Sequence, residues 1–122
     1  MTKTVLIIDD SKVARMILRR ILQSIKPDWP VVEASSGEEA LEAARSTACD
    51  IALVDQHMPG MEGFEVAERL KQDYPDMKIS MVTADIQEAV RRRAEDMDVH
   101  FIPKPAAQDT VSAFLEGVVE QA

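Results

Sequence analysis

The sequence of 122 residues has few aromatic residues, one cysteine and no long apolar run. Cys49 alone permits no disulfide within the chain, which fits a reducing compartment. No apolar run approaches the roughly 18 residues that a membrane-spanning helix needs. The apolar stretch near the N-terminus is short, lacks a small-residue cleavage site and is followed at once by acidic residues, which argues against a signal peptide. We therefore expect a cytoplasmic protein without membrane contact.

Positive charge is also scarce, since 14 Lys and Arg residues stand against 22 Asp and Glu residues. The formal net charge of −8 argues against direct binding of nucleic acid or anionic lipid. The chain is too short for two full domains, and it contains no linker, internal repeat or low-complexity segment. We therefore expect one domain over residues 1–122.

Short apolar runs rich in β-branched residues alternate with segments of helical periodicity along the whole chain. The runs predict five strands, at Val5–Ile8, Val31–Ala34, Ile51–Val54, Ile79–Val82 and Val99–Ile102. The first and third of these are continuously apolar, as expected for strands that are buried on both faces. Strict alternation with five helices predicts an α/β fold in which helices cover both faces of a doubly wound parallel sheet.

The helices have recognisable start signals. Ser11 is a candidate N-cap for the first helix, and Gly63 precedes the third. Two pairs have the spacing of a capping box: Ser36 with Glu39, and Asp85 with Glu88. The last helix is expected after Pro105, with an apolar side of Val111, Phe114, Leu115, Val118 and Val119.

Polar side chains with complementary chemistry follow four of the strands. They are Asp9 and Asp10 after the first, Asp55 after the third, Thr83 after the fourth and Lys104 after the fifth. In open parallel sheets, ligands bind beyond the carboxyl ends of the strands. Neighbouring carboxylates raise one another's pKa unless a cation neutralises them, and Mg²⁺ is the usual choice beside phosphate. Taken singly, each residue has a simpler interpretation as a cap or turn residue, but together they predict a metal site.

The strings IIDDS, LVDQHMPGMEG, VTAD and FIPKP follow one another in this order. They resemble the receiver domain of two-component response regulators, a family that includes the stand-alone chemotaxis response regulator. The resemblance extends from Val5 to about Val119. It implies a flavodoxin-like sheet with strand order 2-1-3-4-5, and a phosphorylation-activated signalling switch rather than an enzyme.

The resemblance also implies roles for particular residues. Asp55 would accept a phosphoryl group from the phosphohistidine of a sensor histidine kinase or phosphotransfer protein. Asp10, Asp55 and the backbone carbonyl of His57 would bind Mg²⁺, with Asp9 acting directly or through water. Lys104 would hold a phosphoryl oxygen. In the family, the proline that corresponds to Pro105 commonly follows a cis peptide bond.

Signal output would depend on Thr83, which would hydrogen-bond the phosphoryl group, and on Phe101, which would turn inward in response. Phe101 has a simpler interpretation as an ordinary core residue. Arg91 and Arg92 are candidates for a face that binds an acidic downstream protein. Their simpler interpretation is a solvated helix face that balances neighbouring acidic residues.

Three positions depart from the family pattern. His57 is less usual than a small polar residue, and either tunes hydrolysis of the acyl phosphate or is an exposed loop side chain. Asp98 stands where glycine is frequent, and Ala106 replaces a bulkier residue. Two other functions compete with the switch: a receiver used only as an unphosphorylated scaffold, and a Mg²⁺-dependent phosphatase with an aspartate nucleophile.

Overall fold

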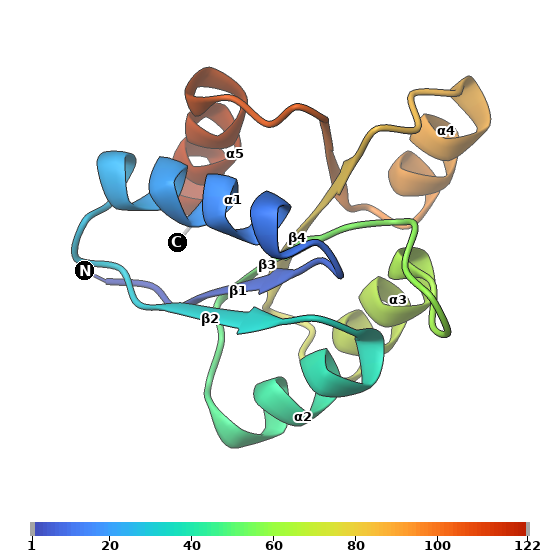
Figure 1. Ribbon diagram of the computed structural model, residues 1–122, viewed down its shortest axis with the longest axis horizontal. Coiled ribbons are helices and arrows are strands. Elements are labelled where there is room, and N and C mark those ends of the chain that lie inside the picture. Colours follow the sequence, from blue (N-terminus) through green and yellow to red (C-terminus); the bar gives the residue numbers. More distant parts are fainter. Residues whose placement is uncertain (1, 122) are drawn as a thin grey trace.

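The computed structural model describes residues 2–121 and alternates strands with helices, as the sequence predicts (Figure 1). The elements are β1 Val5–Ile8, α1 Lys12–Ile25, β2 Val31–Ala34, α2 Gly37–Ser46, β3 Ile51–Val54, α3 Gly63–Asp73, β4 Lys78–Thr83, α4 Glu88–Asp96, β5 His100–Pro103 and α5 Gln108–Gln121. The first three strands have the predicted bounds. β4 is one residue longer at each end than predicted, and β5 lies one residue later.

The five strands form one parallel sheet in the order β2-β1-β3-β4-β5. This confirms the predicted doubly wound, flavodoxin-like fold. The strand order reverses between β1 and β3, the point at which such sheets bind ligands. In the register of this pair, Ile8 stands beside Val54, so the residues that follow the two strands emerge at the same level.

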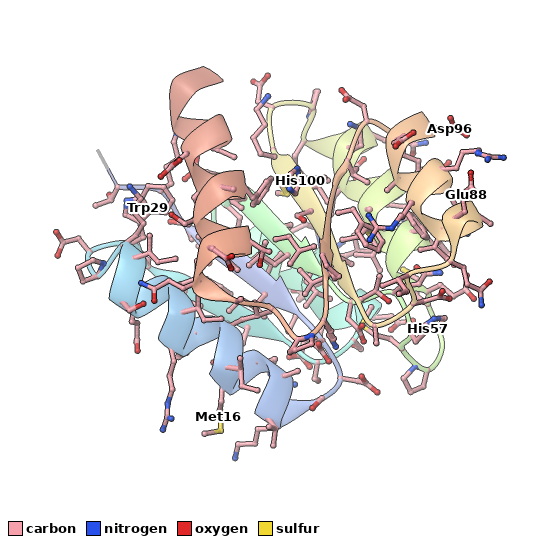
Figure 2. All side chains as sticks on the ribbon, turned by 90° about the horizontal axis from the view of Figure 1, so that it is seen from above. Met16, Trp29, His57, Glu88, Asp96 and His100 are labelled. Carbon is pink, nitrogen blue, oxygen red and sulfur yellow. The ribbon has the colours of Figure 1, made fainter. Side chains whose placement is uncertain are left out.

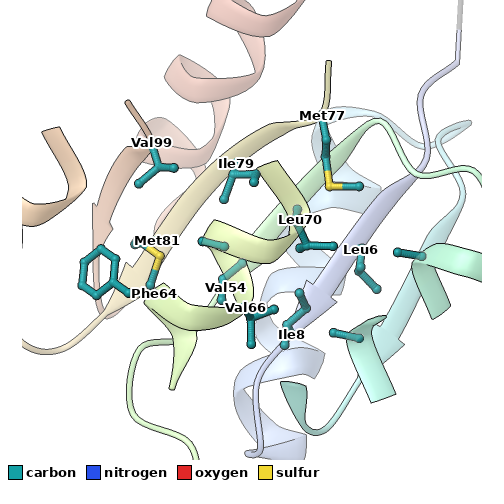
Figure 3. Close-up of a cluster of buried hydrophobic side chains, with 14 of the residues drawn as sticks. Leu6, Ile8, Val54, Phe64, Val66, Leu70, Met77, Ile79, Met81 and Val99 are labelled. Carbon is teal, nitrogen blue, oxygen red and sulfur yellow. The ribbon is translucent and has the colours of Figure 1, made fainter. Parts of the chain in front are cut away.

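Helices cover both faces of the sheet and enclose two hydrophobic clusters. The cluster beneath α2, α3 and α4 contains Leu6, Ile8, Val54, Phe64 and Met81 (Figure 3). The opposite cluster, beneath α1 and α5, contains residues of alternate positions on the same strands, among them Val5, Ile7 and Leu53. Because both faces are covered, the central strands must be apolar throughout, and all of their residues are buried. The predicted apolar side of α5 is buried as far as Val118, and the side chain of Val119 lies outside the described residues.

Two of the predicted helix caps form. The Ser11 hydroxyl accepts a hydrogen bond from the N–H of Ala14 at 3.2 Å, and the Ser36 hydroxyl accepts one from the N–H of Glu39 at 3.1 Å. The Glu39 carboxylate returns to Ser35, one residue before the position that a capping box requires. None of the described helices combines the length and apolar character that a bilayer crossing demands.

The capping box predicted from Asp85 and Glu88 is wrong. α4 begins at Glu88 after the N-cap residue Gln87, which makes no side-chain cap. The Asp85 carboxylate instead accepts the N–H of Gln87 at 3.1 Å, inside the loop that precedes the helix. Asp85 therefore shapes the β4–α4 loop, residues 84–87, rather than the helix terminus.

Candidate functional site

Three carboxylates lie together at the carboxyl ends of β1 and β3. One oxygen from each of Asp9, Asp10 and Asp55 lies within 4.8 Å of the others. Asp9 is 1% exposed and Asp55 is 6% exposed, whereas Asp10 is open to solvent. The sheet register brings them together, because Asp9 and Asp55 continue from paired residues of neighbouring strands.

Lys104 reaches this acidic group from the end of β5. Its Nζ lies 2.8 Å from Asp9 Oδ2 and 3.2 Å from Asp55 Oδ1. Burial opposes the charge of Lys104, yet its hydrogen bond to Asp9 and the nearby charge of Asp55 outweigh burial and raise the pKa of the ammonium. The structure thus joins residues that lie 95 positions apart in the sequence, as the strand ends predict.

Burial and the neighbouring charge of Asp9 raise the pKa of Asp55 above its ordinary value, although Lys104 acts in the opposite direction. A single ammonium therefore does not compensate the charge of the acidic group. Carboxylate oxygens on a partly open site are the ligands that Mg²⁺ prefers, and a second cation would relieve the remaining repulsion. The residues present fit a magnesium site. Which of them bind the ion, the carbonyl of His57 included, stays a prediction.

Asp9 is held in place through both its side chain and its backbone. Its Oδ1 accepts the N–H of Ser11 at 2.9 Å. Its carbonyl oxygen accepts a hydrogen bond from Arg15 Nη1 at 2.7 Å, and Arg15 Nε pairs with Glu33 at 3.0 Å. The sequence gives no signal for Arg15, because its partners Asp9 and Glu33 lie just after β1 and on β2, and no local pattern links them to it. This arginine fixes the acidic group relative to α1 and β2.

The residue after Asp55 was also missed. Gln56 is buried, and its Oε1 accepts the N–H of Phe64 at 2.9 Å, while its carbonyl oxygen accepts the N–H of Gly63 at 3.0 Å. These bonds satisfy free N–H groups in the first turn of α3, a task usually performed by the N-cap side chain. The β3–α3 loop, residues 55–62, is thereby tied to α3 directly beside Asp55.

Thr83 ends β4 and is fully buried. Its Oγ1 accepts the N–H of Asp85 at 3.1 Å. His57 Nε2 lies 3.2 Å from Asp85 Oδ2, and the His57 side chain is 64% exposed (Figure 2). The imidazole is therefore an exposed loop side chain, which is one of the two interpretations given for His57 above. It also has a hydrogen-bond partner on another loop.

The two candidate partner-face arginines are both exposed, and they differ in what they contact. The Arg91 guanidinium lies over the ring of Phe101, with Cζ 4.6 Å from the ring centroid. Arg92 pairs with Glu88 at 2.8 Å, one turn earlier on α4. Phe101 is partly buried and packs at the edge of the cluster beneath α4.

Two backbone conformations agree with expectations from the family pattern. Asp98 adopts a positive φ of 56°, a conformation that aspartate tolerates better than most residues other than glycine. The peptide bond between Lys104 and Pro105 is cis, as the resemblance implies. Fold and site together define a doubly wound α/β domain with an acidic, lysine-bridged site at its switch point.

Comparison with known proteins gives the family of this domain. The family model "Response regulator receiver domain" matches residues 5–116. The response regulator UvrY of Escherichia coli is 36% identical over 111 residues, which cover 89% of this chain and 51% of UvrY. The chain thus spans about half the length of this curated relative. It belongs to the response regulator receiver domain family, whose members are signalling switches controlled by phosphorylation.

Solved structures agree with this assignment. A CheY-like receiver domain protein from Methanospirillum hungatei is 27% identical and superimposes with a TM-score of 0.88, covering 99% of this chain and 97% of that one. The chemotaxis protein CheY4 of Vibrio cholerae is 26% identical with a TM-score of 0.86, covering 97% and 99%. Both are similar to this chain over nearly their whole length.

Proposed function

We propose that Asp55 accepts a phosphoryl group from the phosphohistidine of a sensor histidine kinase or a phosphotransfer protein. One observation carries the proposal: at the switch point of the sheet, the buried Asp55 carboxylate lies beside Asp9, and Lys104 Nζ contacts both carboxylates, at 3.2 Å from Asp55 and 2.8 Å from Asp9. In the reaction, an Asp55 oxygen attacks phosphorus and forms an acyl phosphate, the P–N bond breaks, and the donor imidazole leaves. The chain then acts as a switch and not as an enzyme.

The other site residues have supporting roles in this proposal. Asp9, Asp10, Asp55 and the His57 carbonyl are the groups that would hold Mg²⁺. When bound, the ion supplies positive charge beside the phosphoryl oxygens. Lys104 is already within reach of Asp55 and offers a second positive charge to the transferring group.

An apolar surface beside the site offers a place where the phosphodonor protein could dock. A cavity of about 330 Å³ is lined by residues of α1 together with Lys104, Pro105 and Ala106. α1 exposes Ile17 within this lining, and Val13 and Met16 on the same helix are also exposed. Figure 2 shows the Met16 side chain projecting from α1. Because Lys104 belongs both to this surface and to the acidic group, a donor protein docked here would bring its phosphohistidine towards Asp55.

Output would follow from Thr83 and Phe101. Phosphorylation adds about −1.5 to −2 units of charge at Asp55, which attracts the Thr83 hydroxyl. We propose that Thr83 then moves towards Asp55, that Phe101 repacks, and that the α4 surface bearing Arg91 and Arg92 binds an acidic downstream protein. In this scheme the domain is cytoplasmic and contacts neither nucleic acid nor membrane itself.

The proposal is tested by incubating the protein with Mg²⁺ and acetyl phosphate, followed by intact-mass measurement. A gain of one phosphoryl mass is expected for the native protein and none for Asp55→Ala or without metal. Asp109→Ala, an exposed carboxylate on α5, serves as the matched control and should be phosphorylated normally. An unmodified native protein would favour the scaffold, and steady release of phosphate from varied esters would favour the phosphatase.

A further inference from the structure

A side-chain hydrogen bond joins the two loops that border the site. His57 belongs to the β3–α3 loop and Asp85 to the β4–α4 loop, 28 residues later. Their distance of 3.2 Å between Nε2 and Oδ2 is that of a hydrogen bond. Among the hydrogen bonds of residues 2–121, no other one links these two loops.

Asp85 connects this contact to Thr83. Its backbone N–H donates to Thr83 Oγ1 at 3.1 Å, and its Oδ1 accepts the N–H of Gln87 at 3.1 Å. Asp85 thus uses its amide for Thr83, one carboxylate oxygen for its own loop and the other for His57. A shift of the β4–α4 loop that releases Thr83 must disturb this set of bonds.

The two partners lie in the loops that follow neighbouring strands, each two residues after a residue of the proposed switch. His57 comes two residues after Asp55, and Asp85 comes two residues after Thr83. β3 and β4 are adjacent and parallel, so the two loops leave the same edge of the sheet side by side. In the proposed switch, Thr83 moves towards Asp55. The contact between His57 and Asp85 therefore joins the loop that follows Asp55 to the loop that follows Thr83.

We propose that the contact between His57 and Asp85 is a tether that holds the β4–α4 loop in the unphosphorylated arrangement. In this arrangement the Thr83 hydroxyl is engaged by the Asp85 N–H. Loosening the tether lowers the cost of moving Thr83 towards Asp55, so His57 is a positioning residue that sets the threshold of the switch. The effect of the tether on the switch rests on the proposed function. The tether itself is a contact of the protein without a phosphoryl group.

The size of the effect follows from the exposure of the pair. His57 is 64% exposed and Asp85 is 20% exposed, so solvent screens the interaction and its contribution is that of a surface pair. Surface pairs of this kind shift an equilibrium by about two- to fivefold. Such a shift tunes a switch and does not abolish it.

The first test measures amide hydrogen exchange in the unphosphorylated, metal-free protein. In His57→Ala, the amide of residue 85 should exchange about two- to fivefold faster, because its loop is no longer tethered. Arg92→Ala is the matched control, since it removes an exposed ion pair on α4 that joins no loops. Thermal unfolding of both variants checks that the fold is intact.

The second test measures the affinity for beryllofluoride, an analogue of the phosphoryl group, in the presence of Mg²⁺ by fluorine NMR. His57→Ala and Asp85→Ala should each bind it about two- to fivefold more tightly than the native protein. The double variant should gain no more than Asp85→Ala alone, because that change has already removed the contact with His57.

The outcomes separate the two proposals. Unchanged exchange at residue 85 together with unchanged beryllofluoride affinity would overturn the tether while leaving the proposed function intact. If the native protein binds no beryllofluoride, the proposed function fails, and the exchange measurement still decides whether the tether exists.

Discussion

The guanidinium of Arg91 lies over the ring of Phe101, with 4.6 Å between Cζ and the ring centroid. Arg91 comes from α4 and Phe101 from β5, so the contact attaches the helix to the strand that carries the candidate switch aromatic. Arg92, the next residue, forms its ion pair with Glu88 of the same helix. The two adjacent arginines are therefore not equivalent, although the sequence presents them as one basic patch.

This difference predicts unequal effects of two neighbouring substitutions. Arg91→Ala should lower the free energy of unfolding by about 0.5–1 kcal/mol, the contribution of an exposed cation–aromatic contact. It should also change the NMR shifts of the Phe101 ring. Arg92→Ala should lower the free energy of unfolding by no more than about 0.5 kcal/mol and should leave the NMR shifts of the Phe101 ring unchanged. Urea unfolding and aromatic NMR measure both effects, and equal behaviour of the two variants would contradict the prediction.

Asp55→Asn should stabilise the metal-free protein at neutral pH. Folding raises the pKa of Asp55 through burial and through Asp9, so the unfolded chain ionises more readily than the folded one. Ionisation of Asp55 therefore costs stability as the pH rises through its folded-state pKa, and the cost persists above it. The variant should melt a few degrees higher than the native protein at pH ~7, with little difference below about pH 3.9.

Circular dichroism melting curves across this pH range, in the presence of a chelator, measure the difference. Addition of Mg²⁺ should then raise the melting temperature of the native protein more than that of Asp55→Asn. A native protein that is more stable than Asp55→Asn at neutral pH without metal would show that the Asp55 carboxylate is not under electrostatic strain.

Arg15 and Arg19 provide a matched pair for testing how Asp9 is positioned. Both pair with Glu33, but only Arg15 also donates to the Asp9 carbonyl, at 2.7 Å. Arg15→Ala should lower the free energy of unfolding by about 1–3 kcal/mol, because it leaves a buried acceptor unpaired. It should also weaken Mg²⁺ binding, whereas Arg19→Ala should leave Mg²⁺ binding unchanged. Calorimetric titration with MgCl₂ measures the binding, and parallel losses in both variants would contradict the positioning role.

Two glycines should respond in opposite directions to alanine. A Cβ on Gly63 would meet the carbonyl oxygen of Asp55 and lie 2.8 Å from Gln56 Cα, both in the backbone of the β3–α3 loop, which is hydrogen-bonded to the start of α3. Gly63→Ala should therefore cost more than about 2 kcal/mol. A Cβ on Gly117, within α5, would meet nothing within 4 Å, so Gly117→Ala should stabilise by about 0.5–1 kcal/mol. Denaturant midpoints report both changes.

The sequence predicts this fold well because its local signals agree with one another. Buried strands such as Ile51–Val54 are continuously apolar, and the caps at Ser11 and Ser36 mark true helix starts. The error at Asp85 has a local cause: its spacing to Glu88 imitates a capping box, while its carboxylate is taken by Gln87 and His57. The observed ends of β4 and β5 differ from the predicted ends by one residue. Pairing with neighbouring strands, rather than composition, determines where these strands end.

The site was predictable in its charged groups and not in their support. Asp9, Asp55 and Lys104 follow strands, and parallel strands end at one edge of the sheet, so their convergence follows from topology. Arg15 and Gln56 act through bonds to backbone groups, which every residue possesses and which no side-chain pattern identifies. The contact between His57 and Asp85 likewise depends on the course of two loops, which strand and helix patterns leave open.

The sheet separates the side chains of the interior into two clusters with no member in common. One contains side chains of α1 and α5, and the other contains side chains of α2, α3 and α4. Figure 1 shows these helices on the sheet. Phe101 packs against the cluster beneath α2, α3 and α4 and is not among the described residues of the cluster beneath α1 and α5. In the proposed scheme the donor would bind beside α1 and the downstream target beside α4, so the separation of the two clusters would let either surface change in sequence without altering the packing beneath the other.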